Sequence, residues 1–100
     1  MRSPYNARVP EHKYTQSVQS FYEPALRLLQ HMMEKNKARL RKGNYPESNA
    51  AVKREDFREQ MHHRFRIAIY LTYEIEKSLS KAGLVEFVGS GFLKPKDGGV

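Results

Sequence analysis

The chain contains no cysteine, and this absence removes several kinds of chemistry. Disulfides, thiolate metal sites and a cysteine nucleophile are all excluded, which is typical of proteins that stay inside the cell. The sequence also lacks any apolar run near the roughly 20 residues that span a bilayer. The opening stretch MRSPYNARVPEHK has no apolar signal core, and its two prolines interrupt any transit-peptide helix. We therefore expect an intracellular, cytoplasmic protein with no membrane partner.

Recognisable catalytic motifs are missing as well. The sequence shows no phosphate loop, dinucleotide-binding glycine turn, serine elbow or metalloprotease helix. One Glu-x-x-His spacing, Glu59 to His62, is of the kind that binds metal in carboxylate helix bundles. At about 100° per residue, however, Glu59 falls on the side of a helix opposite to its apolar stripe. The sequence predicts no metal, no other cofactor and no enzymatic activity.

Positive charge is present in excess and is unevenly distributed. The chain has 18 basic and 11 acidic residues, which gives a net charge of +7. Residues 1–42 hold nine of the basic residues and only three acidic ones, whereas residues 67–100 are balanced. An acidic partner, either nucleic acid or an acidic protein surface, is the expected consequence.

One hundred residues form a single domain at most. Prolines punctuate residues 1–13, which we interpret as a flexible arm before a helical domain over residues 14–100. Apolar residues then recur every three or four positions, which predicts a helix from about Thr15 to Lys42. Pro24 either kinks this helix or stands in the first turn of a second one.

A second long helix is predicted from an N-cap at Ser48 or Asn49 to a stop at Gly83. Within it, every odd position over 65–75 is apolar, which is also the alternation of a β-strand. We favour the helix because no turn signal separates this run from its neighbours, and we keep an α+β fold with a strand over 65–75 as the alternative. A helix with apolar residues on all its faces has to pack against other elements on several sides. We therefore predict a homodimer or larger oligomer.

The tail GLVEFVGSGFLKP predicts a β-hairpin, with strands over 84–88 and 92–94 around a glycine-rich turn. A helix that ends at glycine and leads into such a hairpin resembles the wing of a winged-helix DNA-binding domain. The resemblance covers about the last quarter of the chain. It departs from that family because no turn divides the second helix, so the sequence shows no helix-turn-helix. The predicted fold is therefore mainly α: a kinked first helix and a long second helix in a helical hairpin, followed by the small β-hairpin.

The stretch EKNKARLRKGNYP places five cations at the end of the first helix, where Gly43 and Pro46 stop it. By helical geometry the cations surround the axis on two flanks and do not form one stripe. The helix dipole accounts for one or two of them, at about 0.3–1 kcal/mol each. The others suit phosphate contacts, or else a solvated helix end. We call this set the basic collar: Lys35, Lys37, Arg39, Arg41 and Lys42.

Three further cations, Lys53, Arg54 and Arg58, open the second helix and would lie beside the basic collar in a helical hairpin. Acidic neighbours offset most of their charge, so a solvated face is the simpler interpretation of this group alone. Taken together, the eight cations predict a small non-enzymatic module that binds DNA or RNA through its phosphate backbone. The alternative function is a protein-interaction module, an assembly component or small inhibitor, that docks on an acidic protein surface.

Overall fold

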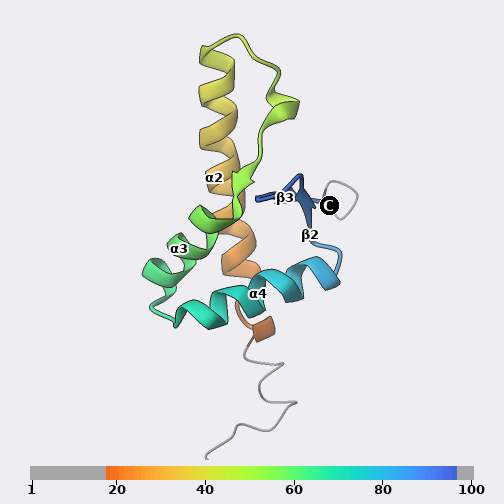
Figure 1. The fold of residues 1–100 in the computed structure, drawn as a ribbon. Helices are drawn as coiled ribbons and strands as arrows, with labels where there is room; N and C mark the ends of the chain where they lie inside the picture. The colour runs from red at the N-terminus through yellow and green to blue at the C-terminus, as the bar shows by residue number, and fades with distance from the viewer. Residues whose placement is uncertain (1–17, 97–100) are drawn as a thin grey trace, which may run out of the picture.

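A long upright helix organises the computed structural model, which describes residues 18–96 (Figure 1). This helix, α2 (Tyr22–Lys42), has Pro24 in its first turn, where a proline removes no helical hydrogen bond. A helix start near Pro24 is thus confirmed, and a kink there is wrong. Gly43 caps the other end as predicted, with its N–H 3.1 Å from the Leu40 carbonyl oxygen. The predicted arm over residues 1–13 and the expected helix start near Thr15 lie outside the described residues.

The predicted fold class, mainly α with a small C-terminal hairpin, is confirmed. Six further elements follow α2 along the chain: η1 (Glu47–Asn49), β1 (Val52–Lys53), α3 (Arg54–Phe65), α4 (Ile69–Lys81), β2 (Val85–Val88) and β3 (Phe92–Pro95).

The single long second helix is wrong, because residues 66–68 divide it into α3 and α4. Arg66 adopts the left-handed conformation, φ 54°, which ends α3 without a glycine. The Nδ1 atom of His62 lies 2.7 Å from the Ile67 carbonyl oxygen across this turn. A carbonyl oxygen only accepts, so Nδ1 carries the proton that makes this hydrogen bond. The alternative of a strand over 65–75 is wrong as well, since α4 begins at Ile69.

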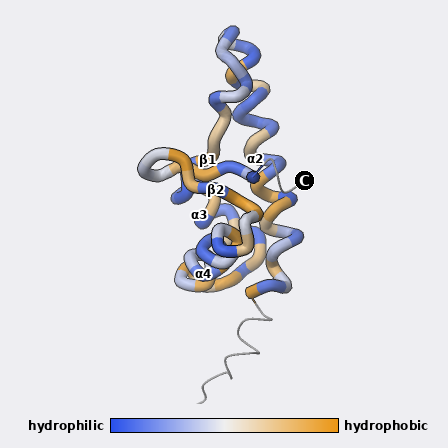
Figure 2. The backbone as a smooth tube through the Cα atoms, turned by 90° about the vertical axis from the view of Figure 1, so that its right-hand side faces the viewer, coloured by the Kyte–Doolittle hydropathy of each residue, from blue (hydrophilic) through white to orange (hydrophobic). Residues whose placement is uncertain are grey.

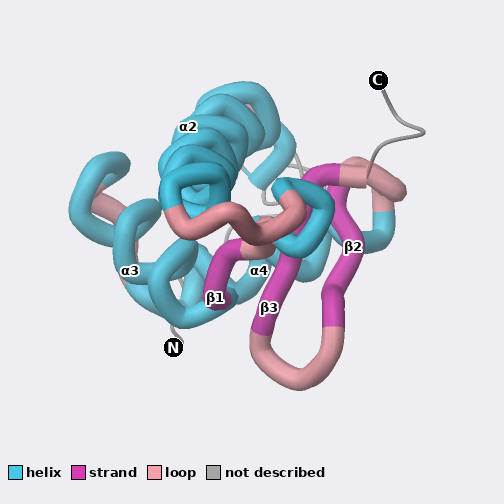
Figure 3. Tube along the Cα trace, turned by 90° about the horizontal axis from the view of Figure 1, so that it is seen from above, coloured by secondary structure: helices cyan, strands magenta, loops and turns pink. Residues whose placement is uncertain are grey.

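The predicted hairpin is confirmed, and it belongs to a three-stranded antiparallel sheet. Strand β3 lies between β1 and β2, as Figure 3 shows from above. Leu93 of β3 is opposite Phe87 of β2 on one side and Val52 of β1 on the other. Strand β1 is only two residues long, and the sequence did not indicate it. It brings the chain from the far end of α2 back to the sheet just before α3 begins.

The core lies where α3, α4 and the sheet close around the first half of α2. Its most buried side chains come from every one of these elements, and each is less than 2% exposed: Leu29, Val52, Phe57, Met61, Ile75, Leu79 and Leu93. The Tyr22 hydroxyl donates to the Ser78 carbonyl oxygen at 3.3 Å, which ties the start of α2 to α4. Figure 2 shows hydrophobic segments on the strands and the hairpin standing out from the helices. Within residues 18–96, none of the helices is long and apolar enough to cross a membrane.

Candidate nucleic-acid interface

The turn at 66–68 creates a helix-turn-helix arrangement, which the sequence did not indicate. Helix α3, a three-residue turn, helix α4 and the β2–β3 hairpin follow one another, and β1 joins the sheet next to β3. This arrangement resembles a winged helix-turn-helix domain, in which the second helix of the pair contacts DNA. Helix α4 occupies that position here. The departure from the winged-helix pattern noted in the sequence therefore disappears.

Helix α4 has one face packed on the core and one face open to solvent. Thr72, Ile75, Glu76 and Leu79 are buried, whereas the opposite face is exposed. On that exposed face Tyr70, Lys77 and Lys81 align at spacings of seven and four, with Glu74 between them in the same line. We call Tyr70, Lys77 and Lys81 the α4 row.

The α4 row is free to meet a partner. The Tyr70 side chain is 66% exposed, which is high for a large aromatic residue. Neither Lys77 nor Lys81 forms an ion pair among the described residues. A phenol and two ammonium groups are all able to donate hydrogen bonds to phosphate oxygens.

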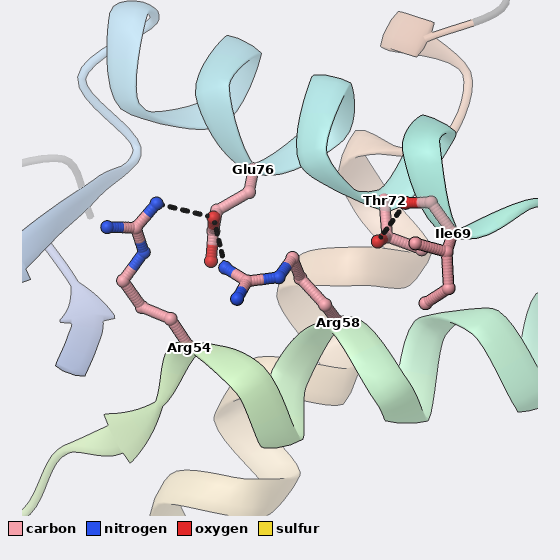
Figure 4. A network of polar contacts seen from close by, with 5 residues as sticks. All are labelled: Arg54, Arg58, Ile69, Thr72 and Glu76. Carbon is pink, nitrogen blue, oxygen red and sulfur yellow. Dashed lines mark hydrogen bonds and ion pairs between the residues drawn. The ribbon is translucent and has the colours of Figure 1, made fainter. Parts of the chain in front are cut away.

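A buried ionic network fixes α4 against α3, as Figure 4 shows. Arg54 and Arg58, one turn apart on α3, each donate to the same Oε1 atom of Glu76 at 2.9 Å. The Glu76 side chain is 1% exposed, so this contact is made largely out of water. The other oxygen, Oε2, has no hydrogen-bond partner in the described part of the chain. Two cations therefore share one carboxylate, and the network keeps a net positive charge.

Two aromatic rings cover this network. The guanidinium carbon of Arg54 lies 4.1 Å from the centre of the Phe87 ring, and that of Arg58 lies 4.2 Å from the centre of the Tyr73 ring. The side-chain hydrogen bond with Glu76 raises the pKa of Arg54 above its ordinary value, although burial opposes that shift. The predicted site residues Arg54 and Arg58 are thus engaged with Glu76, as the link between the two helices.

The basic collar lies far from α4. Helix α2 is 21 residues long, or about 30 Å, and α4 contacts its first turn through Tyr22. The collar occupies the other end, at the top of Figure 1, with α4 at the bottom. The collar and the α4 row are therefore two separate surfaces.

The collar cations are not equivalent. Lys37 pairs with Glu34 at 3.6 Å, and Arg41 pairs with Glu47 at 3.1 Å. Lys35 and Arg39 instead line an open groove between α2 and α3, and Lys42 is exposed at the helix end. Lys35 and Arg39 thus share one flank of the helix, as helical geometry predicted. Three of the five cations have no ion pair among residues 18–96.

Lys53 is the one cation of the second predicted group that remains exposed. It lies in β1, opposite Phe92 of β3, and it lines the groove between α2 and α3 together with Lys35 and Arg39. Of the three cations expected beside the basic collar, Lys53 shares a groove with collar residues. Arg54 and Arg58 instead pair with Glu76.

The sequence analysis did not single out the three residues of the α4 row, Tyr70, Lys77 and Lys81, or the buried Glu76 behind them. A signal for Glu76 was present, because Thr72, Ile75, Glu76 and Leu79 have the spacing of a buried helix face. A carboxylate at such a position needs a cationic partner to be buried. The α4 row had no such signal, since its exposure depends on the turn at 66–68.

Comparison with protein-family models, with curated proteins and with solved structures gave no significant match. The part of the chain from 18 to 96 also has no group of three or more His, Asp or Glu side chains that could hold a metal ion. His62 of the Glu-x-x-His spacing bonds the Ile67 carbonyl oxygen. The site is therefore interpreted from its own geometry.

Proposed function

We propose that the protein is a non-enzymatic DNA-binding module that presents α4 to the major groove of a duplex. The observation that carries this proposal is the α3–turn–α4 unit, whose second helix exposes the α4 row. Cations of the row bring the phosphate attraction that the net charge of +7 led us to expect. A DNA partner fits the intracellular, cytoplasmic location inferred from the lack of cysteine.

Duplex DNA is a better partner than duplex RNA for this shape. The major groove of B-form DNA is about 12 Å wide and admits an α-helix. The major groove of A-form RNA is deep and narrow, so α4 could not enter it. The short hairpin turn, over residues 89–91, has no charged side chain. Phosphate contacts should therefore come mainly from Lys77, Lys81 and Lys53.

A salt series tests the proposal. Three or four phosphate contacts predict a slope of about −3 to −4 for log affinity against log salt. Binding to a fluorescent 20-base-pair DNA should then weaken by about a hundredfold between 50 and 200 mM salt. Duplex RNA of the same sequence should bind more weakly at every salt concentration. Absence of DNA binding at about 50 mM salt would contradict the proposal.

A protein-interaction module is the second candidate, and one observation favours it. An open groove of about 710 Å³ lies between the second half of α2 and α3, with Leu28, Met32 and Leu40 among its lining residues. Lys35 and Arg39 stand on its α2 side, and Asp56 and Glu59 stand on its α3 side. Lys53 and Arg64 line it as well, so the groove combines apolar residues with charges of both signs. Such a groove is better suited to binding a protein segment of mixed charge than a uniformly acidic surface.

The homodimer stays a prediction, although its basis changes. The apolar run over 65–75 no longer forms one helix, so its apolar surface no longer favours a dimer. Two copies on adjacent half-sites would suit a duplex, as in other helix-turn-helix proteins. Light scattering should then give about twice the chain mass of 11.7 kDa. A mass near 11.7 kDa at micromolar concentration would contradict the dimer.

A further inference from the structure

An open groove of about 560 Å³ lies between the start of α3, the side of α4 and the hairpin turn. We call it the wing groove. It is separate from the α4 row, none of whose residues line it. Its side walls are formed by residues from four elements: Lys53, Arg54, Glu55, Arg58, Tyr73 and Phe92.

Two exposed aromatic rings line the wing groove. Tyr73 is 50% exposed and Phe92 is 41% exposed. Arg58 lies over the Tyr73 ring, which is still half exposed and lines the groove. Phe92 projects from the middle strand of the sheet and has Lys53 and Val88 opposite it in register. Large aromatic residues are usually buried, and each of these rings offers a flat apolar surface to a ligand.

The same groove is positively charged. Lys53 is exposed and has no ion pair in the described chain, while Arg54 and Arg58 share the single negative charge of Glu76. Glu55 is the one acidic residue that lines the groove. Cations along a groove with aromatic rings beside them are the combination by which proteins hold single-stranded nucleic acid, since phosphates meet the cations and bases stack on the rings.

We propose that the wing groove holds unpaired bases of a single-stranded DNA extension that adjoins the bound duplex. This inference rests on the proposed function: the groove adjoins α4 through Tyr73, so a duplex that ends there could pass its single strand into the groove. Tyr73 provides one stacking surface and Phe92 a second, next to Lys53, which contacts the phosphate backbone where the duplex ends. The protein would then prefer duplexes with a single-stranded tail over blunt ones.

A comparison of tailed and blunt duplexes tests this preference. A 15-base-pair DNA with a three-thymine tail, on either the 5′ or the 3′ strand, should bind the wild-type protein about tenfold more tightly than the blunt duplex. Stacking is worth about 1–3 kcal/mol per base, so tenfold corresponds to a single stacked base. Phe92→Leu should remove most of the preference and leave blunt-duplex affinity unchanged, and Tyr73→Leu should also remove most of the preference. Leucine keeps apolar volume at each position, which protects the fold.

Tyr45→Leu is the matched control, because Tyr45 is 64% exposed and lines no part of the wing groove. It should retain the full preference for tails. A 2-aminopurine base in the tail provides a second readout: its fluorescence should be quenched by wild-type protein and recover with Tyr73→Leu. Equal affinity for tailed and blunt duplexes would overturn this inference and leave the proposed function standing. Failure to bind either duplex would overturn both.

Discussion

Replacing Glu76 by glutamine is expected to lower the free energy of unfolding by about 3 kcal/mol. The substitution keeps the size of the side chain but removes the one negative charge that pairs with Arg54 and Arg58 among residues 18–96. Removing one partner of a buried ion pair typically costs about 3–5 kcal/mol, because the remaining charge is left without compensation. We expect the lower end of that range, since one third of the Arg54 side chain remains in contact with water. The melting temperature should fall by roughly 10–20 °C.

Urea unfolding followed by circular dichroism measures this loss. Glu86→Gln is the matched control: Glu86 faces Lys94 at 3.9 Å with 46% of its side chain exposed. Such a surface pair contributes about 1 kcal/mol or less. The triple replacement Arg54→Met, Arg58→Met and Glu76→Leu should recover most of the stability, because a buried ionic network can often be exchanged for apolar packing. Wild-type stability of Glu76→Gln would show that the network does not hold α4 against α3.

Much of this fold was predictable because its strongest signals are local. Gly43 ended the first helix, and the glycines at 89 and 91 marked the hairpin turn between two apolar runs. The hairpin turn depends on the conformations that glycine permits, because Gly89 and Gly91 both have positive φ. Gly43 caps α2 at φ −92°, and the left-handed residue there is Asn44. Neither prediction needed knowledge of distant contacts.

The turn at 66–68 could not be predicted for a physical reason. Apolar positions Phe57, Met61 and Phe65 continue through Ala68 to Ile75 at nearly helical spacing, as if no break existed. The break is made by Arg66 in a left-handed conformation that favours glycine or asparagine. The hydrogen bond from the His62 side chain to the Ile67 carbonyl oxygen spans this turn. The sequence predicted the cluster of cations in the basic collar. It did not predict that the collar lies far from α4, because the position of α4 depends on the turn at 66–68.

Removing both lysines of the α4 row is expected to weaken DNA binding by roughly 30- to 100-fold at 100 mM salt. Each phosphate contact contributes about 0.9 to the salt slope, so Lys77→Ala with Lys81→Ala should make the slope shallower by about 1.8. The fold should be unaffected, because both side chains are exposed and make no ion pair among residues 18–96. Circular dichroism of the double variant checks this point.

The matched comparison is Lys35→Ala with Arg39→Ala, which removes the same charge from the basic collar. These two residues stand on the second half of α2, whereas α4 contacts its first turn. A duplex that lies on α4 should therefore lose less than threefold affinity in this variant, with nearly the wild-type salt slope. The reverse result, a large loss from the collar pair and a small one from the α4 pair, would move the DNA contact to the collar. It would then show that the cations first noticed in EKNKARLRKGNYP, and not the helix-turn-helix, hold the phosphate backbone.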